Sequence, residues 1–453
     1  MVKKPVTSYR CADCGHTAVK WVGRCPECQA WGTLEERGDS RPAIARVAAG
    51  APSAPARPIG EVDVETARAK PTGVSELDRV LGGGLVPGAV ILLAGEPGVG
   101  KSTLLLEVAY QWAATAGRSL YVTGEESAGQ VRLRAERTGN VHGEMYLAAE
   151  SDLSSILGHV DAVKPGMMIV DSIQTMASPQ AEGAPGGVTQ VRAVAAGLVA
   201  LAKERGLPIV LVGHVTKDGS VAGPRVLEHL VDVVLQFEGD KHSTLRMLRG
   251  VKNRFGAADE VGCFELVEEG IVGVADPSGL FMSRTAEPVP GTAITVAVEG
   301  KRPLLGEVQA LVSKSSMPQP RRAVSGLDSA RVSMVLAVLE KRGGLKLGDK
   351  DVYTATVGGM KITEPAIDLA VVLAIASSVE EVALSPRLVS IGEVGLAGEV
   401  RRVPNVARRL AEAARLGFTH ALVPPDSGRM PEGIRALEVG DVASALNAAS
   451  HAR

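Results

Sequence analysis

The sequence has few aromatic residues and no long apolar run. Phe, Trp and Tyr make up 3% of its 453 residues, whereas hydrophobic residues make up 45%. The cores must therefore be built from Val, Leu, Ile and Ala. The longest apolar candidate, residues 369–379, is shorter than the roughly 18 residues of a membrane span and predicts a buried helix instead. The Lys-rich N-terminus lacks the apolar segment of a signal peptide, so we expect a cytoplasmic protein with no membrane partner.

An excess of charge of one sign is also absent. The formal net charge is −2, so the composition of the whole chain argues neither for nor against a nucleic-acid partner. The length predicts about two to four domains.

Cysteine is rare, but four of the five cysteines lie in the first 28 residues. Cys11 and Cys14 form one C-x2-C pair, and Cys25 and Cys28 form a second. Four thiolates in this pattern are typical of a tetrahedral, structural Zn²⁺ site with no open position for catalysis. Two disulfides are the alternative, but the cytosol keeps thiols reduced. We predict a zinc domain over residues 1–35 whose folding energy comes from the metal.

Two of the three tryptophans, Trp21 and Trp31, lie in the same segment. We expect them to pack on the cysteine turns; the alternative is that they stack on nucleic-acid bases. Residues 36–58 are rich in Ala, Pro, Arg and Gly without apolar periodicity and predict a flexible linker. Cys263 stands alone in an apolar run and is expected to be a core residue.

A complete phosphate-binding loop of the form G-x-x-x-x-G-K-[ST] occupies residues 95–102. An apolar run over 90–94 predicts a buried strand before it, and residues 103–114 predict a helix after it. Lys101 can reach the outer phosphates of ATP, and Ser102 can ligate Mg²⁺. The glycines allow successive N–H groups to face a phosphate chain. The predicted nucleotide-binding residues are Gly95, Glu96, Pro97, Gly98, Val99, Gly100, Lys101, Ser102 and Thr103.

A second apolar strand ends in a carboxylate. Residues 167–170 are apolar and Asp171 follows them, so this side chain is expected to hold Mg²⁺ directly or through water. Hydrolysis also needs a group that orients water. Glu125 is our candidate, with Glu126 as the alternative, because both directly follow another predicted strand.

Strands and helices alternate along this part of the chain. Strands are predicted over 120–123, 167–171 and 208–214, with a helix over 188–205. Such alternation indicates a parallel sheet covered on both faces. The glycine-bearing segments 178–188 and 214–220 are expected to be loops at the same edge of the sheet.

The order of three motifs resembles one family. A four-cysteine motif comes first, the phosphate-binding loop follows, and residues 252–256 read Lys-Asn-Arg-Phe-Gly. By its residues alone, the pentapeptide favours a solvated strand end. Together the motifs resemble the RadA (Sms) family of bacterial DNA repair proteins, in which the pentapeptide is a signature. The resemblance extends over essentially the whole chain.

The resemblance implies a RecA-like ATPase core over residues 59–284 in a homo-hexameric ring related in form to replicative helicases. It implies a DNA-dependent ATPase of helicase type that processes recombination intermediates and promotes branch migration. The partners it implies are single-stranded and branched DNA and the RecA recombinase.

The resemblance also assigns roles to residues. Residues 95–102 match the nucleotide loop, and Asp171 matches the Mg²⁺ ligand. Lys252 and Arg254 match the two basic positions of the signature, which in a ring could reach the neighbouring subunit's nucleotide or the DNA. An arginine supplied across an interface can raise the rate by roughly 10³–10⁵. Residues 214–220 match the loop that links the nucleotide state to the DNA channel.

Residues 285–453 predict another α/β unit, which in this family resembles the proteolytic domain of Lon proteases. Those enzymes use a serine nucleophile with a lysine base. Here the serine position within 363–368 holds Ala366, and the base position falls near Ala407. No lysine follows Lys361, so a hydroxyl in the nucleophile position would lack its base. We predict a degenerate domain that is not a protease.

Several arginines gather near the C-terminus. They predict either a solvated helix face or a patch that contacts the backbone of duplex DNA. They are Arg401, Arg402, Arg408, Arg409 and Arg415.

The sequence thus predicts an α/β fold: a RecA-like P-loop ATPase core with an N-terminal four-cysteine zinc knuckle and a C-terminal Lon-protease-like α/β domain. A Lon-type ATP-dependent protease is one alternative function, and the missing dyad argues against it. A nucleotide-switched assembly protein without translocation is another. The zinc motif and the Lys-Asn-Arg-Phe-Gly segment favour the DNA motor.

Overall fold

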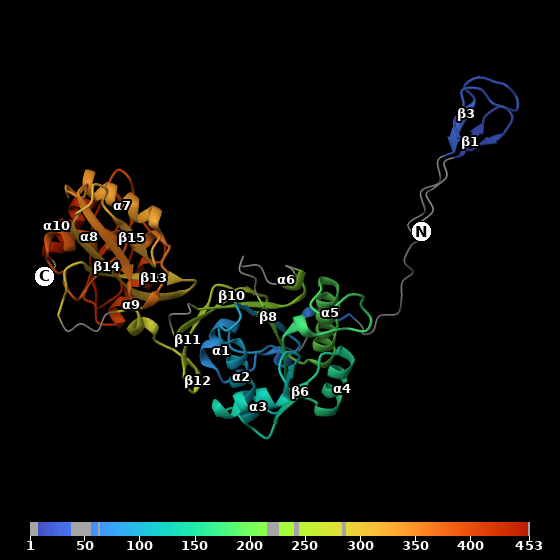
Figure 1. The fold of residues 1–453 in the computed structure, drawn as a ribbon, viewed down its shortest axis with the longest axis horizontal. Coiled ribbons are helices and arrows are strands. Elements are labelled where there is room, and N and C mark those ends of the chain that lie inside the picture. The colour runs from blue at the N-terminus through green and yellow to red at the C-terminus, as the bar shows by residue number, and fades with distance from the viewer. Residues whose placement is uncertain are drawn as a thin grey trace. The chain divides into compact units, whose positions relative to one another are not determined.

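A computed structural model describes residues 8–37, 56–61, 64–214, 226–239, 244–282 and 287–451 (Figure 1). The chain forms two compact units, Met1–Asp63 and Val64–Arg453. Most of the predicted linker over 36–58 lies outside the described residues. Among the helices of the described ranges, none is long and apolar enough to cross a membrane.

The smaller unit is a three-stranded antiparallel sheet in the order β2-β1-β3. The strands are β1 (Ser8–Cys11), β2 (Thr17–Ala18) and β3 (Leu34–Arg37). Its buried core consists of Cys11, Cys25 and Leu34, with Tyr9 and Ala18 packed against it. Three side chains bury too little apolar area to hold a fold, so a metal has to supply the remainder.

The expectation that Trp21 and Trp31 pack on the cysteine turns is wrong. Trp21 is 61% exposed and Trp31 is 75% exposed. The buried core of the described residues consists of smaller side chains. Instead, the guanidinium of Arg24 lies over the ring of Trp31, 5.7 Å from its centroid.

The larger unit begins with a nine-stranded sheet in the order β12-β11-β10-β9-β4-β8-β7-β5-β6. The six strands from β9 to β6 in this order run parallel, and β10, β11 and β12 extend the sheet as antiparallel strands. The bounds are β4 (Val90–Gly95), β5 (Ser119–Thr123), β6 (Met145–Ala149), β7 (Met167–Asp171), β8 (Ile209–His214), β9 (Val233–Glu238), β10 (Leu245–Asn253), β11 (Val261–Val267) and β12 (Gly270–Gly273).

Helices cover both faces of the parallel part, as the alternating pattern predicts (Figure 1). Ile91 and Leu93 face one core with α1, α2 and α3, whereas Val90 and Leu92 face the other with α4, α5 and α6. A strand buried on both faces is apolar throughout, which explains the unbroken run before the phosphate loop. The helices are α1 (Ser75–Leu81), α2 (Lys101–Thr115), α3 (Ala128–Arg137), α4 (Leu153–Val163), α5 (Val188–Arg205) and α6 (Val226–Leu230).

The C-terminal part holds a seven-stranded mixed sheet in the order β15-β16-β14-β13-β17-β20-β21. Its helix α8 is buried along most of its length, in agreement with the helix predicted over 369–379. The strands are β13 (Thr292–Glu299), β14 (Arg302–Lys314), β15 (Arg322–Ser325), β16 (Lys350–Thr356), β17 (Leu388–Ser390), β20 (His420–Val423) and β21 (Arg435–Glu438), and a separate hairpin pairs β18 (Glu393–Val394) with β19 (Val400–Arg401). The helices are α7 (Ser329–Lys341), α8 (Asp368–Glu380), α9 (Val406–Arg415) and α10 (Val442–His451).

The mixed α/β class is confirmed, whereas the Lon-like nature of this part and the domain border at residue 285 stay predictions. The turn between β13 and β14 joins the two sheets. Arg302 forms a buried ion pair with Glu76 of α1, and Lys301 pairs with Asp259 at 3.0 Å. Gly300 has φ +61°, and a Cβ there would lie 1.9 Å from the carbonyl oxygen of Asp259. The turn therefore needs glycine at its closest approach to the nine-stranded sheet.

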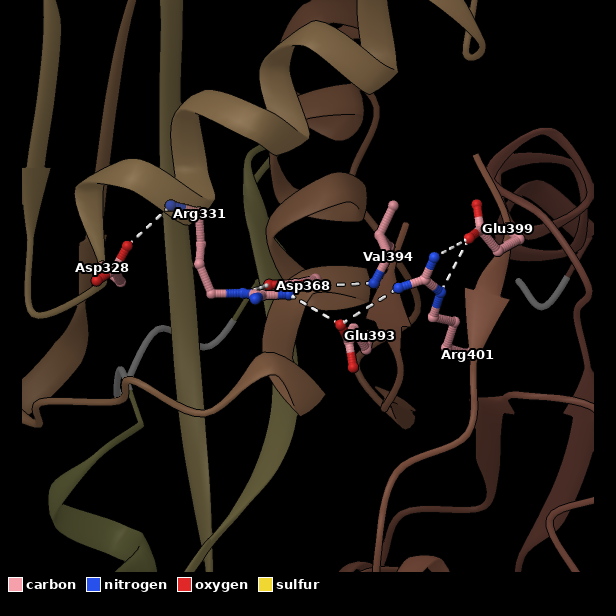
Figure 2. Close-up of polar contacts among 7 residues, drawn as sticks. All are labelled: Asp328, Arg331, Asp368, Glu393, Val394, Glu399 and Arg401. Carbon is pink, nitrogen blue, oxygen red and sulfur yellow. Dashed lines mark hydrogen bonds and ion pairs between the residues drawn. The ribbon is translucent and has the colours of Figure 1, made fainter. Parts of the chain in front are cut away.

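A network of charges links α7, α8 and the β18–β19 hairpin (Figure 2). Arg331 forms a bidentate contact with Asp368, which is buried, and its guanidinium lies 3.6 Å from Glu393. Arg401 continues the network from Glu393 to Glu399. Burial raises the pKa of Asp368, and the Arg331 guanidinium opposes this effect.

Candidate nucleotide-binding site and zinc centre

The phosphate-binding loop lies between β4 and α2, as the sequence predicts. Glu96, Pro97 and Gly98 are exposed at its tip. Gly100 has φ +108°, a conformation that glycine adopts without strain. The loop thus leads directly into the N-terminus of α2, where free backbone N–H groups favour an anion.

Lys101 points back into the loop. Its Nζ donates to the carbonyl oxygens of Gly95 and Glu96, each at 2.9 Å. Burial lowers the pKa of the ammonium group, and the charges of Asp171 and Glu125 oppose this shift. The three side chains therefore share one electrostatic environment at the carboxyl ends of the parallel strands.

Asp171 is held by a neighbour that the sequence does not reveal. The parallel strands β5 and β7 place Thr123 opposite Asp171 in register. Tyr121, two residues earlier on β5, donates from its hydroxyl to Oδ2 of Asp171 at 2.6 Å. Burial, followed by the charge of Asp171, raises the pKa of Tyr121 well above its ordinary value, so the phenol stays a donor. A lone Tyr in an apolar strand gives no signal of such a role.

Glu125 and Glu126 follow β5, and their side chains contact different partners. Glu125 Oε1 accepts a hydrogen bond from the Ser172 hydroxyl and lies 2.9 Å from Nε2 of His214 at the end of β8. Burial raises the pKa of Glu125, but the Ser172 and His214 hydrogen bonds and the charges of His214 and Lys101 outweigh burial and lower it. Glu125 is therefore a carboxylate near neutral pH.

Glu126 turns to α3, where it forms an ion pair with Arg134. The sequence gives no signal for Ser172, and it marks His214 only as the first residue of a loop whose remainder, 215–220, lies outside the described residues.

Arg246 of β10 is another residue that the sequence does not point to. Its Nε donates to the carbonyl oxygen of Val99 in the phosphate loop at 3.0 Å, and the side chain is buried. Nothing in the sequence links residue 246 to residue 99, because the contact depends on how two distant strands join one sheet.

The structure does not bring Lys252 and Arg254 to the phosphate loop. Lys252 Nζ donates to the carbonyl oxygens of Glu228 at 2.6 Å and Val231 at 2.7 Å, at the C-terminal end of α6. Arg254 pairs with Asp232 at 3.2 Å, and the same carboxylate accepts a hydrogen bond from the N–H of Val90.

Val90 is the first residue of β4, whereas the phosphate loop follows its last residue. A six-residue strand spans roughly 20 Å. The two basic side chains therefore lie at the amino end of β4, and the nucleotide loop lies at its carboxyl end.

The region of the expected serine–lysine dyad contains a different pair. Ala366 is buried. Glu364 accepts hydrogen bonds from both terminal nitrogens of Arg409 at 2.7 Å and from the N–H of Val298 at 2.7 Å. Arg409 is 1% exposed and also donates to the carbonyl oxygen of Val296.

Arg409 therefore does not belong to a surface patch, and both interpretations of the arginine cluster are wrong for this residue. Leu410 and Ala413 of α9 face the core. Arg409 lies on the same buried face of the helix and contacts Glu364 there. Two other members of the cluster are paired at the surface: Arg401 with Glu399, and Arg415 with Glu412 and Asp276.

The four cysteines of the smaller unit converge. Sγ of Cys11 lies 3.6 Å from Sγ of Cys28, and Cys14 and Cys25 are separated by the same distance. All four sulfurs lie within 4.8 Å of one another, and none forms a disulfide. Zn–S bonds of about 2.3 Å place tetrahedral sulfurs roughly 3.8 Å apart, so the set fits Zn²⁺. The Thr33 hydroxyl, followed by the N–H of Cys14, lowers the pKa of Cys11 to about 6. The N–H of Ala30 lowers the pKa of Cys28, but the neighbouring thiols outweigh it and raise that pKa to about 12, so the two thiols of this pair differ in how readily they ionise.

Comparisons with known proteins match both units. Family models for a rubredoxin metal binding domain and an AAA domain match residues 9–36 and 55–220. The DNA repair protein RadA of Mycolicibacterium smegmatis is 58% identical over 97% of this chain and 96% of its own length. The proteins of the same name are 57% identical over 97% and 92% in Mycobacterium tuberculosis, and 47% identical over 99% and 99% in Streptococcus pyogenes.

Among solved structures, a KaiC-like protein from Pyrococcus horikoshii aligns with 46% of this chain and 99% of its own, with 22% identity and a TM-score of 0.39. The alignments with the curated relatives extend through the zinc site, the phosphate loop and the C-terminal sheet alike, over nearly the full length of each chain. The chain thus belongs to the family of DNA repair proteins named RadA, and its AAA domain makes it an ATP-hydrolysing enzyme.

Proposed function

We propose that the protein is a DNA-dependent ATPase motor of helicase type that processes recombination intermediates and promotes branch migration. The observation that carries this proposal is the convergence of Lys101, Glu125 and Asp171 at one edge of a parallel sheet, while Lys252 and Arg254 lie at the other. The nucleotide-site groups lie together, and the two cations of the signature lie away from them. This separation suits an assembly in which the cations of one subunit reach the nucleotide of its neighbour.

In the proposed site, the loop N–H groups and Lys101 bind the phosphates of ATP. Ser102 and Asp171 would hold Mg²⁺, which supplies charge to the β- and γ-phosphates when it is bound. Tyr121 fixes the orientation of Asp171 through its 2.6 Å hydrogen bond. Glu125 orients the attacking water, and Ser172 and His214 keep its carboxylate ionised and in place.

The homo-hexameric ring is part of the proposal. In a ring, Lys252 and Arg254 would face the neighbouring subunit's nucleotide or the DNA. Arg254 is more than half exposed in the single chain, so its guanidinium has room for a second partner beside Asp232. Single-stranded and branched DNA and the RecA recombinase are the partners we propose.

We further propose that the C-terminal part is a Lon-protease-like domain without proteolytic activity. Ala366 has no hydroxyl, and the nearby Glu364–Arg409 pair is a bidentate, structural contact. A guanidinium cannot serve as a base near neutral pH because it stays protonated.

The deciding experiment measures ATP turnover by the purified protein with and without single-stranded DNA, followed by movement of a branched DNA substrate. The proposal expects DNA to stimulate turnover and branch movement to require hydrolysis. If DNA did not change ATP turnover and the protein assembled in response to nucleotide, the result would instead favour a nucleotide-switched assembly protein.

A further inference from the structure

The two tryptophans of the smaller unit take no part in its core. The cluster of buried side chains contains Cys11, Cys25 and Leu34, and both indoles are open to solvent. A tryptophan left in water exposes a large apolar surface with a flat aromatic face. Two of them at one place indicate a surface that a partner covers.

Both rings approach the same glycine. A Cβ atom on Gly23 would lie 3.8 Å from Cζ3 of Trp31 and 3.9 Å from Cη2 of Trp21. The backbone fixes this arrangement, because the N–H of Gly32 donates to the carbonyl oxygen of Gly23 at 3.0 Å and Arg24 forms an antiparallel bridge with Trp31. The glycine thus leaves the space beside both rings free of any side chain of its own.

Positive charge borders the rings. The Arg24 guanidinium stacks on Trp31 and donates to the backbone oxygen and to Oε1 of Gln29 at 2.8 and 2.7 Å, which holds it in place. Lys20 directly precedes Trp21. Between Trp21 and Trp31 the charged residues are Arg24 and Glu27, and of these Arg24 lies over a ring. Aromatic faces together with nearby cations match the two parts of a single-stranded nucleic acid, its bases and its phosphates.

We propose that Trp21 and Trp31, with Arg24 and Lys20, form a stacking platform for the bases of a single-stranded nucleic acid. The inference rests on the proposed DNA motor and gives the zinc site a role, since the metal fixes the short sheet that carries the rings. Stacking on an aromatic face is tolerant of sequence, because every base has such a face. The platform therefore binds the strand whatever its base sequence.

The small number of tryptophans makes the test direct. Besides the two platform residues the chain has one more, Trp112, which is 2% exposed in α2. Full-length, zinc-loaded protein is titrated with an oligothymidylate and with an abasic oligodeoxynucleotide carrying the same number of phosphates. We expect quenching of tryptophan emission by the oligothymidylate alone, and about tenfold or greater preference for it.

Single substitutions separate the rings from the charges. Trp21→Ala and Trp31→Ala should each weaken oligothymidylate binding about five- to hundredfold, leave binding of the abasic strand unchanged and retain the zinc. Trp31→Phe should restore most of the loss. The matched control is Leu133→Ala, an exposed apolar residue on α3, which should change neither affinity.

Each other outcome overturns the platform in a recognisable way. Equal binding of both strands with unchanged emission, while DNA still stimulates ATP turnover, removes the platform and leaves the motor. Failure to bind either strand, with no stimulation, removes both. Protection of Trp21 and Trp31 from acrylamide quenching in the DNA-free protein would show that the chain itself covers the rings.

Discussion

At the scale of single residues, the nucleotide site depends on side chains that fix one another. Lys101 is buried, and its favourable charges are Asp171 and Glu125. Asp171 is held by Tyr121, and Glu125 by Ser172 and His214. Two substitutions test the roles proposed here.

Lys101→Ala should reduce ATP hydrolysis at least about a hundredfold, because the outer phosphates lose the positive charge that stabilises them in the transition state. The melting temperature should change little, since the lysine contacts only loop carbonyl oxygens. Steady-state turnover and thermal unfolding measure the two effects. Undiminished turnover in a clean preparation would refute the assignment.

Glu125→Gln should lower turnover about 10²- to 10⁴-fold while nucleotide binding persists, because the amide keeps the size but not the charge that orients water. Glu126→Gln is the matched control and should change turnover only a few-fold, since Glu126 is engaged with Arg134. The comparison needs single-turnover rates and nucleotide affinities for both variants. The reverse order of defects would transfer the role to Glu126.

At the scale of elements, the zinc-bearing sheet has too small an apolar core to fold alone, whereas α7, α8 and the β18–β19 hairpin add a charge network to the apolar core that they share. The zinc-bearing sheet has three buried side chains, and the network of Figure 2 holds charges between α7, α8 and the β18–β19 hairpin.

The zinc unit should contain one Zn²⁺ per chain, and Cys25→Ser should lose it. The short sheet should then unfold, because the metal supplies its folding energy. The ATPase melting transition should stay in place, since the two compact units are separate in the chain. Metal analysis and calorimetry on the full-length protein follow both effects. Purified protein with four oxidised cysteines and no metal would contradict the assignment.

Arg331→Met should destabilise the protein by about 3–5 kcal/mol, because it leaves the buried Asp368 carboxylate without its guanidinium. Arg401→Met belongs to the same network but is exposed, and should cost less than about 1 kcal/mol. Urea unfolding compares the two.

Burial raises the pKa of Asp368, so its protonated form favours the folded state. The loss in Arg331→Met should therefore shrink at acidic pH and grow as the pH rises through the folded-state pKa. If Arg331→Met and Arg401→Met lost the same free energy of unfolding, the buried contact would stabilise the protein no more than the exposed one.

At the scale of the whole molecule, the sequence predicts what depends on neighbours along the chain. The strands before Gly95 and ending at Asp171, and the helix over 188–205, lie where their patterns place them. What the patterns do not reveal depends on how distant segments meet: Tyr121 reaches Asp171 only through the pairing of β5 with β7, and Arg246 reaches the loop only across the sheet.

Two expectations fail for a related reason. Charge does not reveal burial, so the sequence alone groups Arg409 with surface arginines. Size and hydrophobicity do not guarantee burial either, as Trp21 and Trp31 show in a unit too small to enclose them.

The proposed ring predicts how defective and normal subunits combine. Arg254→Ala should leave nucleotide binding nearly intact, because the residue lies at the far end of β4 from the loop. Mixed with wild-type chains, it should depress DNA-stimulated turnover more than dilution alone, since each altered chain impairs its neighbour's site. Arg254→Lys should not restore activity, because an ammonium lacks the planar fork of a guanidinium.

A fall in proportion to the wild-type fraction would argue against a role across the subunit boundary. Lys252→Ala is the companion variant. It removes two contacts to the end of α6, so its effect should include a loss of stability. Arg254→Ala should cost less stability, because the buried Asp232 carboxylate keeps its 2.7 Å ion pair with Lys203.

The turn between β13 and β14 has a practical consequence for anyone dissecting the chain. A fragment that stops at residue 284 keeps Glu76, which is 1% exposed, and its pair with the more exposed Arg79 at 3.4 Å, but it discards the buried partner Arg302. Removing one partner of a buried ion pair costs up to about 3–5 kcal/mol, a large share of the roughly 5–15 kcal/mol that keeps a typical domain folded. Insolubility of such a fragment would therefore reflect where the cut was made, and replacing Glu76 with Gln in the same fragment is the remedy to try first.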